Sequence, residues 1–220
     1  MIDKLSGNNL FLIRHGQSIY NLENRFTGWK DVELTDLGIS QAIEAGDILS
    51  KITFDLCYTS NLSRAQNTLN LILEKMNQNP KIIKDEALNE RDYGDLIGQN
   101  KLEAAKKFGS KQVQIWRRSF DVPPPGGESL KMTAERTLPY YNSVIKPQIT
   151  SGKNIIISAH GNSIRAIVMD IFNLTSEQIL KTEIGWCEPW ALSFNDQGEL
   201  LNYQIIERQS EPSKSRLFLD

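Results

Sequence analysis

The residues most able to do chemistry are two histidines, each of which follows a short apolar run. His15 comes after Leu10 to Ile13 within NLFLIRHGQ, and His160 comes after Ile155 to Ile157 within NIIISAHGN. They are the chain's two histidines. Such runs are typical of strands buried on both faces of a parallel sheet, and ligands collect beyond the carboxyl ends of these strands. Both imidazoles are therefore predicted to reach a ligand.

The chemistry that these residue types favour is phosphoryl transfer. An imidazole nitrogen attacks phosphorus and leaves again readily, so His15 could carry a covalent phosphoryl group. The transfer spreads negative charge over the phosphoryl oxygens, which Arg14, Arg64 and a protonated His160 could stabilise. A leaving alkoxide also needs a proton, and Glu90 is the candidate general acid. To hold that proton near neutral pH, Glu90 would need burial or a nearby anion.

Other devices for phosphoryl transfer are absent from the sequence. There is no GxxxxGK[ST] phosphate loop, no cysteine closely followed by an arginine, and no HExxH or aspartate-rich metal motif. Arginines would take the place that a magnesium ion occupies in many such enzymes. We therefore expect a reaction without a metal ion.

The bulk composition is that of an ordinary globular chain with little charge bias. The 220 residues are 40% hydrophobic and 24% charged, and the formal net charge is -2. This charge argues against general binding to nucleic acid or to an anionic membrane. No apolar run approaches the length of a membrane span, and Met1 to Asn8 lacks the features of a signal peptide. We expect a cytoplasmic chain in which the isolated Cys57 and Cys187 are inert thiols.

The candidate catalytic residues must be positioned by strands and helices that alternate along the chain. This alternation predicts an α/β fold with a mostly parallel central sheet covered by helices on both faces. No shift in composition marks a second domain, so we expect a single domain over residues 1–220, with a mobile polar tail from about Arg208. The expected strands are 10–13, 54–59, 81–84, 155–157 and a closing hairpin of 190–194 with 200–206. The expected helices start near 35, 60 and 162 or span 101–108, 111–120 and 128–145.

Several residues mark where helices should begin, bend or end. Thr35, Ser60 and Asn162 precede apolar stripes and are predicted N-caps. Arg64 falls in the first turn of its helix, where a positive charge opposes the helix dipole unless an anion binds there too. Pro139 predicts a kink in the helix over 128–145, and Pro147 is expected beyond its end.

Two sequence patterns identify a family. Arg14-His15-Gly16 with the distant His160-Gly161 resembles the histidine phosphatase superfamily. From Leu10 to about Phe194 the chain is similar to the cofactor-dependent phosphoglycerate mutase family within it. The blocks that carry this second resemblance are Asn21-Leu22-Glu23-Asn24-Arg25-Phe26-Thr27-Gly28-Trp29, Leu88-Asn89-Glu90-Arg91-Asp92-Tyr93-Gly94, Trp116-Arg117-Arg118 and Ala159-His160-Gly161-Asn162-Ser163.

The resemblance implies a fold, a reaction and a set of site residues. It implies a phosphoglycerate mutase-like fold and the interconversion of 3-phosphoglycerate and 2-phosphoglycerate, primed by 2,3-bisphosphoglycerate, with a lesser phosphatase activity. His15 would be the phosphorylated nucleophile and Glu90 the proton donor. Arg14, Arg64, His160 and Asn21 would hold the transferring group. The rest of the anionic substrate would contact Thr27, Gly28, Arg91, Tyr93, Lys101, Arg117, Arg118, Gly161 and Asn162. The resemblance admits a homodimer or a homotetramer without deciding between them.

The chain departs from the family pattern at a few positions. Gln17 stands where the family usually has Glu, and Asp92 stands where it often has His. The elbow from Pro123 to Gly127 is shorter than the insertion of many members. The segment from Gly185 to Trp190 also differs from the usual Gly-Val-Pro. The two substitutions neighbour predicted catalytic residues, so they bear on rate or pH dependence rather than on the reaction.

Two other functions stay open at the level of sequence. A phosphatase would use the same His15 and pass the phosphoryl group to water. Lys101, Arg117 and Arg118 favour the mutase, because its bisphosphate needs a second cationic cluster several ångströms from the reacting phosphorus. A catalytically silent phosphoryl-binding module is the third alternative, and an intact Glu90 argues against it.

Overall fold

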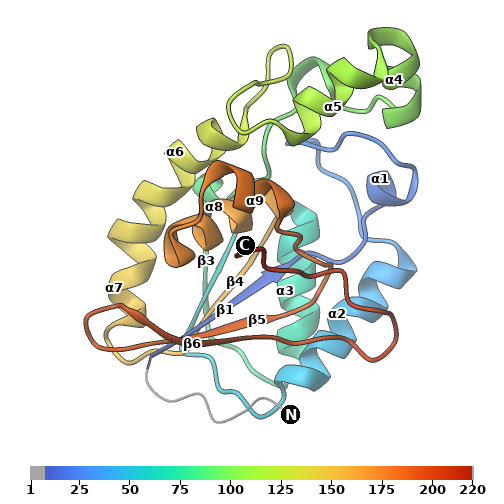
Figure 1. Cartoon of the computed structure of the whole chain (residues 1–220). Coiled ribbons are helices and arrows are strands. Elements are labelled where there is room, and N and C mark those ends of the chain that lie inside the picture. Colours follow the sequence, from blue (N-terminus) through green and yellow to red (C-terminus); the bar gives the residue numbers. More distant parts are fainter. Residues whose placement is uncertain (1–7, 220) are drawn as a thin grey trace.

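The computed structural model describes residues 8–219, which form a six-stranded sheet flanked by helices (Figure 1). The strand order is β3-β2-β4-β1-β5-β6. The first four of these run parallel, and the last two form an antiparallel edge hairpin. The strands are β1 (Asn8–Arg14), β2 (Leu56–Thr59), β3 (Lys81–Lys84), β4 (Ile155–Ala159), β5 (Trp190–Phe194) and β6 (Leu200–Ile205). The prediction of a mostly parallel sheet is confirmed.

Helices cover both faces of this sheet, also as predicted. The alternating side chains of β1 show this directly, because Leu10 and Leu12 pack into one core and Phe11 and Ile13 into the other. One core is closed by α2 (Asp36–Leu49) and α3 (Ser63–Lys75), and the other by α6 (Leu130–Tyr140) and α8 (Gly161–Phe172). Shorter helical elements are α1 (Ile19–Leu22), η1 (Glu86–Leu88), η2 (Gly94–Leu96), η3 (Tyr141–Ile145), α7 (Lys146–Ile149) and α9 (Ser176–Lys181).

A pair of helices lies apart from the sheet, on the side toward which the parallel strands point (Figure 1). These are α4 (Lys101–Phe108) and α5 (Ser110–Arg118), joined at Gly109, whose φ of 87° favours glycine. The pair has a small core of its own, formed by Phe26, Leu96, Ala104 and Val113. Because this core is separate, α4 and α5 can present side chains toward the ends of the strands.

Of the three predicted N-caps, Thr35 is confirmed, because its side chain accepts a hydrogen bond from the backbone N–H of Gly38. The other two are wrong: the N-cap position of α3 is Leu62 rather than Ser60, and that of α8 is His160 rather than Asn162. In each case the loop after the strand has a different length from the one that the capping pattern suggests. Asn162 consequently lies inside the first turn of α8, and Ser60 is left in the loop before α3.

The helix predicted over 128–145 is longer than expected and interrupted. Ser129 caps it by accepting a hydrogen bond from the backbone N–H of Met132, and the path continues through the π-helical η3 into α7. Pro139 lies inside α6, just before the π-helical turn. Pro147 lies in the first turn of α7 and not beyond the helix, a position where the missing N–H is tolerated.

The polar tail packs along the domain. Arg208 is 4% exposed and forms ion pairs with Glu44 and Glu211. The buried carboxylate of Glu188 accepts hydrogen bonds from the backbone N–H groups of Lys214 and Ser215. Mobility of this tail in the absence of ligand stays a prediction.

Two expectations about location meet limits in the structure. No helix between residues 8 and 219 combines the length and the apolar character needed to cross a membrane. The expectation that Met1 to Asn8 is no signal peptide rests on residues 1–7, which lie outside the described part of the chain. Cys57 and Cys187 are both buried and unpaired, as expected.

The loop after β1 rests on the first turn of α2 through two glycines. A Cβ atom on Gly16 would lie 2.3 Å from the carbonyl oxygen of Gly38, and one on Gly38 would lie 2.1 Å from that of Gln17. Both obstacles are backbone atoms, which move only if the loop moves. This contact fixes the backbone next to His15.

We predict that Gly38→Ala destabilises the protein although alanine is the better helix former. The propensity gain is about 0.8–1 kcal/mol, whereas overpacking against a fixed backbone typically costs about 1–3 kcal/mol. Chemical denaturation measures the net loss, with the exposed Ser40→Ala on the same helix as the control. A Gly38→Ala protein as stable as the control would show that the loop can move aside.

Candidate active site

The two histidines meet because β1 and β4 are neighbours in the sheet. Arg14 pairs with Ala159 in the parallel register, and the backbone N–H of His15 donates to the carbonyl of Ala159 at 3.0 Å. The ring centroids of His15 and His160 are 5.0 Å apart, and both residues are buried. The structure thus brings the two predicted histidines into one site.

His15 has the tautomer of a nucleophile. Its Nδ1 lies 2.7 Å from the carbonyl oxygen of Gly16, which can only accept a hydrogen bond, so Nδ1 carries the proton. The lone pair is then on Nε2. Burial lowers the pKa of His15 well below its ordinary value, and the charges of Arg64 and Arg14 lower it further. The imidazole is therefore neutral at physiological pH.

In the unliganded site His160 is neutral as well, whereas the sequence led us to expect a protonated His160. Burial is the main reason that its pKa lies well below the ordinary value, followed by the charge of Arg64, the neighbouring His15 ring and the charge of Arg14. Its Nε2 lies 2.7 Å from the hydroxyl oxygen of Ser60. Sequence reasoning assigned Ser60 a capping role and missed this contact, although its position directly after β2 is the same as that of His15 after β1.

Two arginines supply fixed positive charge beside the histidines. Backbone carbonyls hold both, because Arg14 donates to Ile184 at 2.9 Å and Arg64 donates to Gly28 at 2.9 Å. The Nε atom of each guanidinium is buried and has no hydrogen-bond partner within residues 8–219. Burial lowers the pKa of Arg64 to about 10, so the group still carries its charge at neutral pH. An anion would satisfy both groups.

Glu90 faces the same space as a carboxylate. Its Oε1 accepts hydrogen bonds from the backbone N–H of Arg91 at 2.8 Å and from the side-chain amide of Asn162 at 2.9 Å. Burial alone raises the pKa of Glu90, but the charge of Arg14 and these hydrogen bonds hold it below its ordinary value. Glu90 must therefore gain a proton before it can act as an acid.

An open pocket adjoins these buried groups, and most of the predicted site residues line it. The lining includes Arg14, Asn21, Thr27, Gly28, Glu90, Tyr93, Lys101, Arg117, Arg118, Gly161 and Asn162. His15, Arg64, His160 and Arg91 are buried and do not line it. Arg91 instead donates to the hydroxyl of Tyr93 at 2.7 Å and to the carbonyl of Arg117 at 3.2 Å, so it braces the wall of the pocket.

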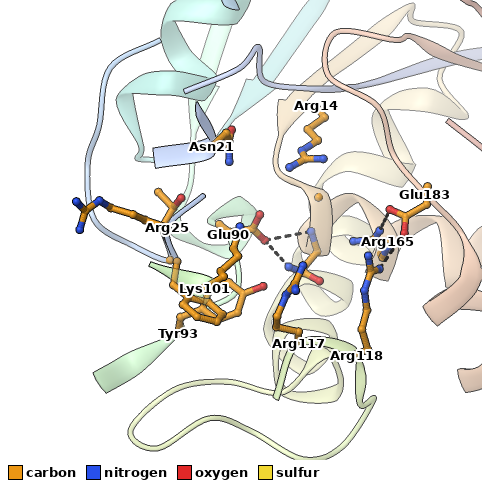
Figure 2. Close-up of a pocket in the computed structure, with 15 residues that line it drawn as sticks. Arg14, Asn21, Arg25, Glu90, Tyr93, Lys101, Arg117, Arg118, Arg165 and Glu183 are labelled. Atoms are coloured by element: carbon orange, nitrogen blue, oxygen red, sulfur yellow. Dashed lines mark hydrogen bonds and ion pairs between the residues drawn. The ribbon is translucent and has the colours of Figure 1, made fainter. Parts of the chain in front are cut away.

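A second group of cations lies across the pocket on α4 and α5. Figure 2 shows Arg117 and Arg118 entering from the same side, with Lys101 close to Tyr93. Burial lowers the pKa of Lys101 to about 8, and the charges of Arg117 and Arg14 add to this effect. The mutual repulsion of these cations would be relieved by an anionic ligand.

Sequence reasoning missed four further residues of the lining, which are Arg25, Phe26, Arg165 and Glu183. Arg165 lies one turn after Asn162 on α8 and pairs with Glu183 at 2.7 Å, and Glu183 also pairs with Arg118 at 2.9 Å (Figure 2). The spacing of three residues from Asn162 could have indicated Arg165, since such residues share a helix face. Arg25 also lines the pocket, but its guanidinium pairs with Glu23.

The geometry as a whole suits phosphoryl transfer to a histidine. It combines a neutral imidazole with a free Nε2, guanidinium groups whose Nε atoms have no partner among the described residues, and a carboxylate that lines the adjoining pocket. The second cationic group provides a binding position for the far end of a ligand with two anionic ends. Among the described residues, no three or more His, Cys, Asp or Glu side chains gather as a metal site would require.

Comparisons with known proteins agree with this chemistry. The model of the histidine phosphatase superfamily (branch 1) matches residues 10–205. A 2,3-bisphosphoglycerate-dependent phosphoglycerate mutase from Parvibaculum lavamentivorans is 50% identical over 92% of this chain and 99% of its own. The phosphoglycerate mutase of Schizosaccharomyces pombe is 48% identical over 94% of this chain and 100% of its own.

Solved structures with the same fold include phosphatases. A mycobacterial glucosyl-3-phosphoglycerate phosphatase is 26% identical, with a TM-score of 0.77 over 90% of this chain and 97% of its own. The alpha-ribazole phosphatase from Shigella flexneri has a TM-score of 0.77 at 23% identity, covers 90% of this chain and 95% of its own, and shows the fold alone. With the family model matched across its sheet and curated mutases about half identical over nearly its whole length, the chain belongs to the histidine phosphatase superfamily, in the phosphoglycerate mutase family.

Proposed function

We propose that this chain is an isomerase that interconverts 3-phosphoglycerate and 2-phosphoglycerate through a phosphohistidine, primed by 2,3-bisphosphoglycerate. The observation that carries the proposal is a pair of cationic groups, one beside the buried histidines and one across the adjoining pocket. Arg14 and Arg64 lie beside the histidines, and Lys101, Arg117 and Arg118 lie across from them. A bisphosphate with two anionic ends matches this arrangement better than a simple phosphomonoester does.

His15 starts the reaction in this proposal. Its Nε2 attacks a phosphorus of the bisphosphate, the bond from that phosphorus to the substrate oxygen breaks, and Glu90 protonates the leaving oxygen. Arg14 and Arg64 stabilise the charge that develops on the phosphoryl oxygens. The phosphoenzyme then transfers its group to the free hydroxyl of a phosphoglycerate, whose proton returns to Glu90.

Substrate binding favours the protonation of Glu90. A bound phosphate adds negative charge next to the carboxylate, and like charges raise the pKa of a carboxyl group. The low pKa of Glu90 in this structure is thus the pKa of the unliganded site. Binding and protonation are coupled, and Asn162 keeps the carboxylate oriented throughout.

The other site residues hold the substrate in this proposal. The phosphoryl group and the carbon chain of the glycerate would contact Asn21, Thr27, Gly28 and Gly161. The far end of the substrate would bind Tyr93 and the cations on α4 and α5. Arg91 would act through Tyr93 and α5 rather than by touching the substrate. Transfer of the group to water at the same His15 would give the lesser phosphatase activity.

The remaining expectations are part of the same proposal. We propose that residues 1–220 act as a single domain and that the reaction needs no metal ion. The reaction belongs to glycolysis and gluconeogenesis, for which the cytoplasm is the proposed location. A homodimer or a homotetramer is the proposed assembly.

The first test asks where the phosphoryl group is carried. Incubation with 2,3-bisphosphoglycerate labelled in its phosphates should give a protein-bound label that is lost in acid and survives base, as a phosphoramidate does. His15→Ala should carry no such label, because the proposed acceptor of the phosphoryl group is the free Nε2 of His15. A label that persists on the His15→Ala protein would contradict the assignment.

A second prediction concerns Glu90 and pH. Glu90→Gln should lower kcat by about 10²–10⁴-fold with little change in KM, while the neighbouring exposed Glu86→Gln should leave both unchanged. In the wild type, activity should fall as pH rises through the pKa of Glu90 in the substrate complex. That pKa, read from kcat, should lie above the pKa read from kcat/KM. Persistence of the same alkaline limb in Glu90→Gln would assign the proton to another group.

A third prediction separates the mutase from a phosphatase. Replacing Arg117 and Arg118 with Ala should raise KM for 3-phosphoglycerate at least about tenfold, because each charge-assisted hydrogen bond contributes roughly 1.5–3 kcal/mol. Priming by the bisphosphate should be suppressed, and hydrolysis of a small phosphomonoester should be largely spared. Lys111→Ala, exposed on the same helix, is the control. Equal loss of both activities would mean that these arginines serve the common chemical step or folding.

A further inference from the structure

Three neighbouring strands end in side chains that meet at the histidine pair. His15 follows β1, His160 follows β4 and Ser60 follows β2, and β4 lies between the other two strands. Ser60 and His160 are both fully buried, and the Ser60 hydroxyl oxygen lies 2.7 Å from Nε2 of His160. One of the two atoms must donate the hydrogen in this bond.

The other bonds of Ser60 decide which atom donates. Its hydroxyl oxygen already accepts a hydrogen bond from the backbone N–H of Leu62 at 3.2 Å. Within residues 8–219, the acceptor available to the Ser60 hydroxyl proton is Nε2 of His160. A buried hydroxyl whose proton had no acceptor would be costly, so Ser60 donates and Nε2 accepts. The proton of a neutral His160 is then on Nδ1.

The location of this proton matters because His160 is neutral. A neutral imidazole has a single N–H, whereas an imidazolium has two. Nδ1 of His160 is buried and has no hydrogen-bond partner in the described part of the chain, as is true of Nε in Arg14 and Arg64. These three atoms are N–H groups that could point their hydrogens at one anion. With the proton on Nε2 instead, Nδ1 would present a lone pair that repels a phosphoryl oxygen.

We propose that Ser60 is a positioning residue that holds His160 with its proton on Nδ1, so that the neutral imidazole donates a hydrogen bond to the phosphoryl group transferred to His15. The inference rests on the proposed phosphohistidine chemistry and adds a residue to it. Ser60 does not touch the substrate. It acts by removing the alternative tautomer of His160.

The wild-type tautomer can be read without substrate. The chain has two histidines, so nitrogen NMR of protein labelled with ¹⁵N in its imidazoles contains signals from His15 and His160 alone. A protonated ring nitrogen and an unprotonated one resonate far apart. We expect His160 to show a protonated Nδ1 and an unprotonated Nε2, with His15→Ala used to assign the signals. A protonated Nε2 in unliganded His160 would overturn the proposal.

The variant Ser60→Ala removes the donor with little change in shape. Its His160 should show a mixture of tautomers, and its kcat should fall at least about tenfold, up to the roughly 10²–10³-fold loss that follows removal of a transition-state donor. KM should change little, because the charge develops in the transition state. An unchanged tautomer with an unchanged kcat would overturn the proposal.

The matched control is Thr59→Val, which removes a buried hydroxyl one residue earlier. The hydroxyl of Thr59 donates to the carbonyl of Ser158 at 2.9 Å rather than to His160. Thr59→Val should retain the wild-type tautomer and kcat, and an equal loss of kcat in both variants would overturn the proposal. If Ser60→Ala does not fold, the wild-type spectrum decides alone. A failure of the mutase function would appear as absent turnover of 3-phosphoglycerate, which leaves the tautomer measurement intact.

Discussion

The structure depends on keeping guanidinium groups charged inside the protein. Arg64 is almost completely buried and Arg14 partly so, and removing a charge from water is unfavourable unless polar partners replace the water. The chain supplies these partners from its backbone, through the carbonyls of Gly28, Lys30 and Ile184. Carbonyl groups stabilise a cation without neutralising it, so both guanidinium groups keep a positive charge that can attract an anion.

The protonation states of the other groups follow from burial together with these two charges. The histidines are neutral mainly because burial disfavours their charged forms, and the two guanidinium charges disfavour those forms further. Glu90 stays ionised for the opposite reason, since Arg14 compensates its burial. The same buried environment therefore keeps His15 neutral, as a nucleophile must be, and keeps Glu90 ionised until the substrate binds. The ion pairs of Glu183 moderate the field at the far end of the pocket.

The sequence predicts the fold well and the electrostatics poorly, for physical reasons. Apolar runs and the alternation of strands with helices are local, and they identified the sheet and its covered faces. The ends of the strands identified His15 and His160. The contact between Ser60 and His160 depends on which strands become neighbours, and no local pattern contains that information. The charge of His160 depends on burial, which exists only after the chain has packed.

The position of β4 has a consequence for how the protein is made. This strand is translated late, yet it lies between β1 and β2, which come from the first part of the chain. A nascent chain that has emerged only as far as α6 cannot close its sheet, because the central place is still empty. The site therefore cannot be complete before β4 is made, because this strand supplies both the central place in the sheet and His160, which follows it. Arg64 and its carbonyl partners Gly28 and Lys30 are translated earlier, so one half of the phosphate site is present in the chain before the other half exists.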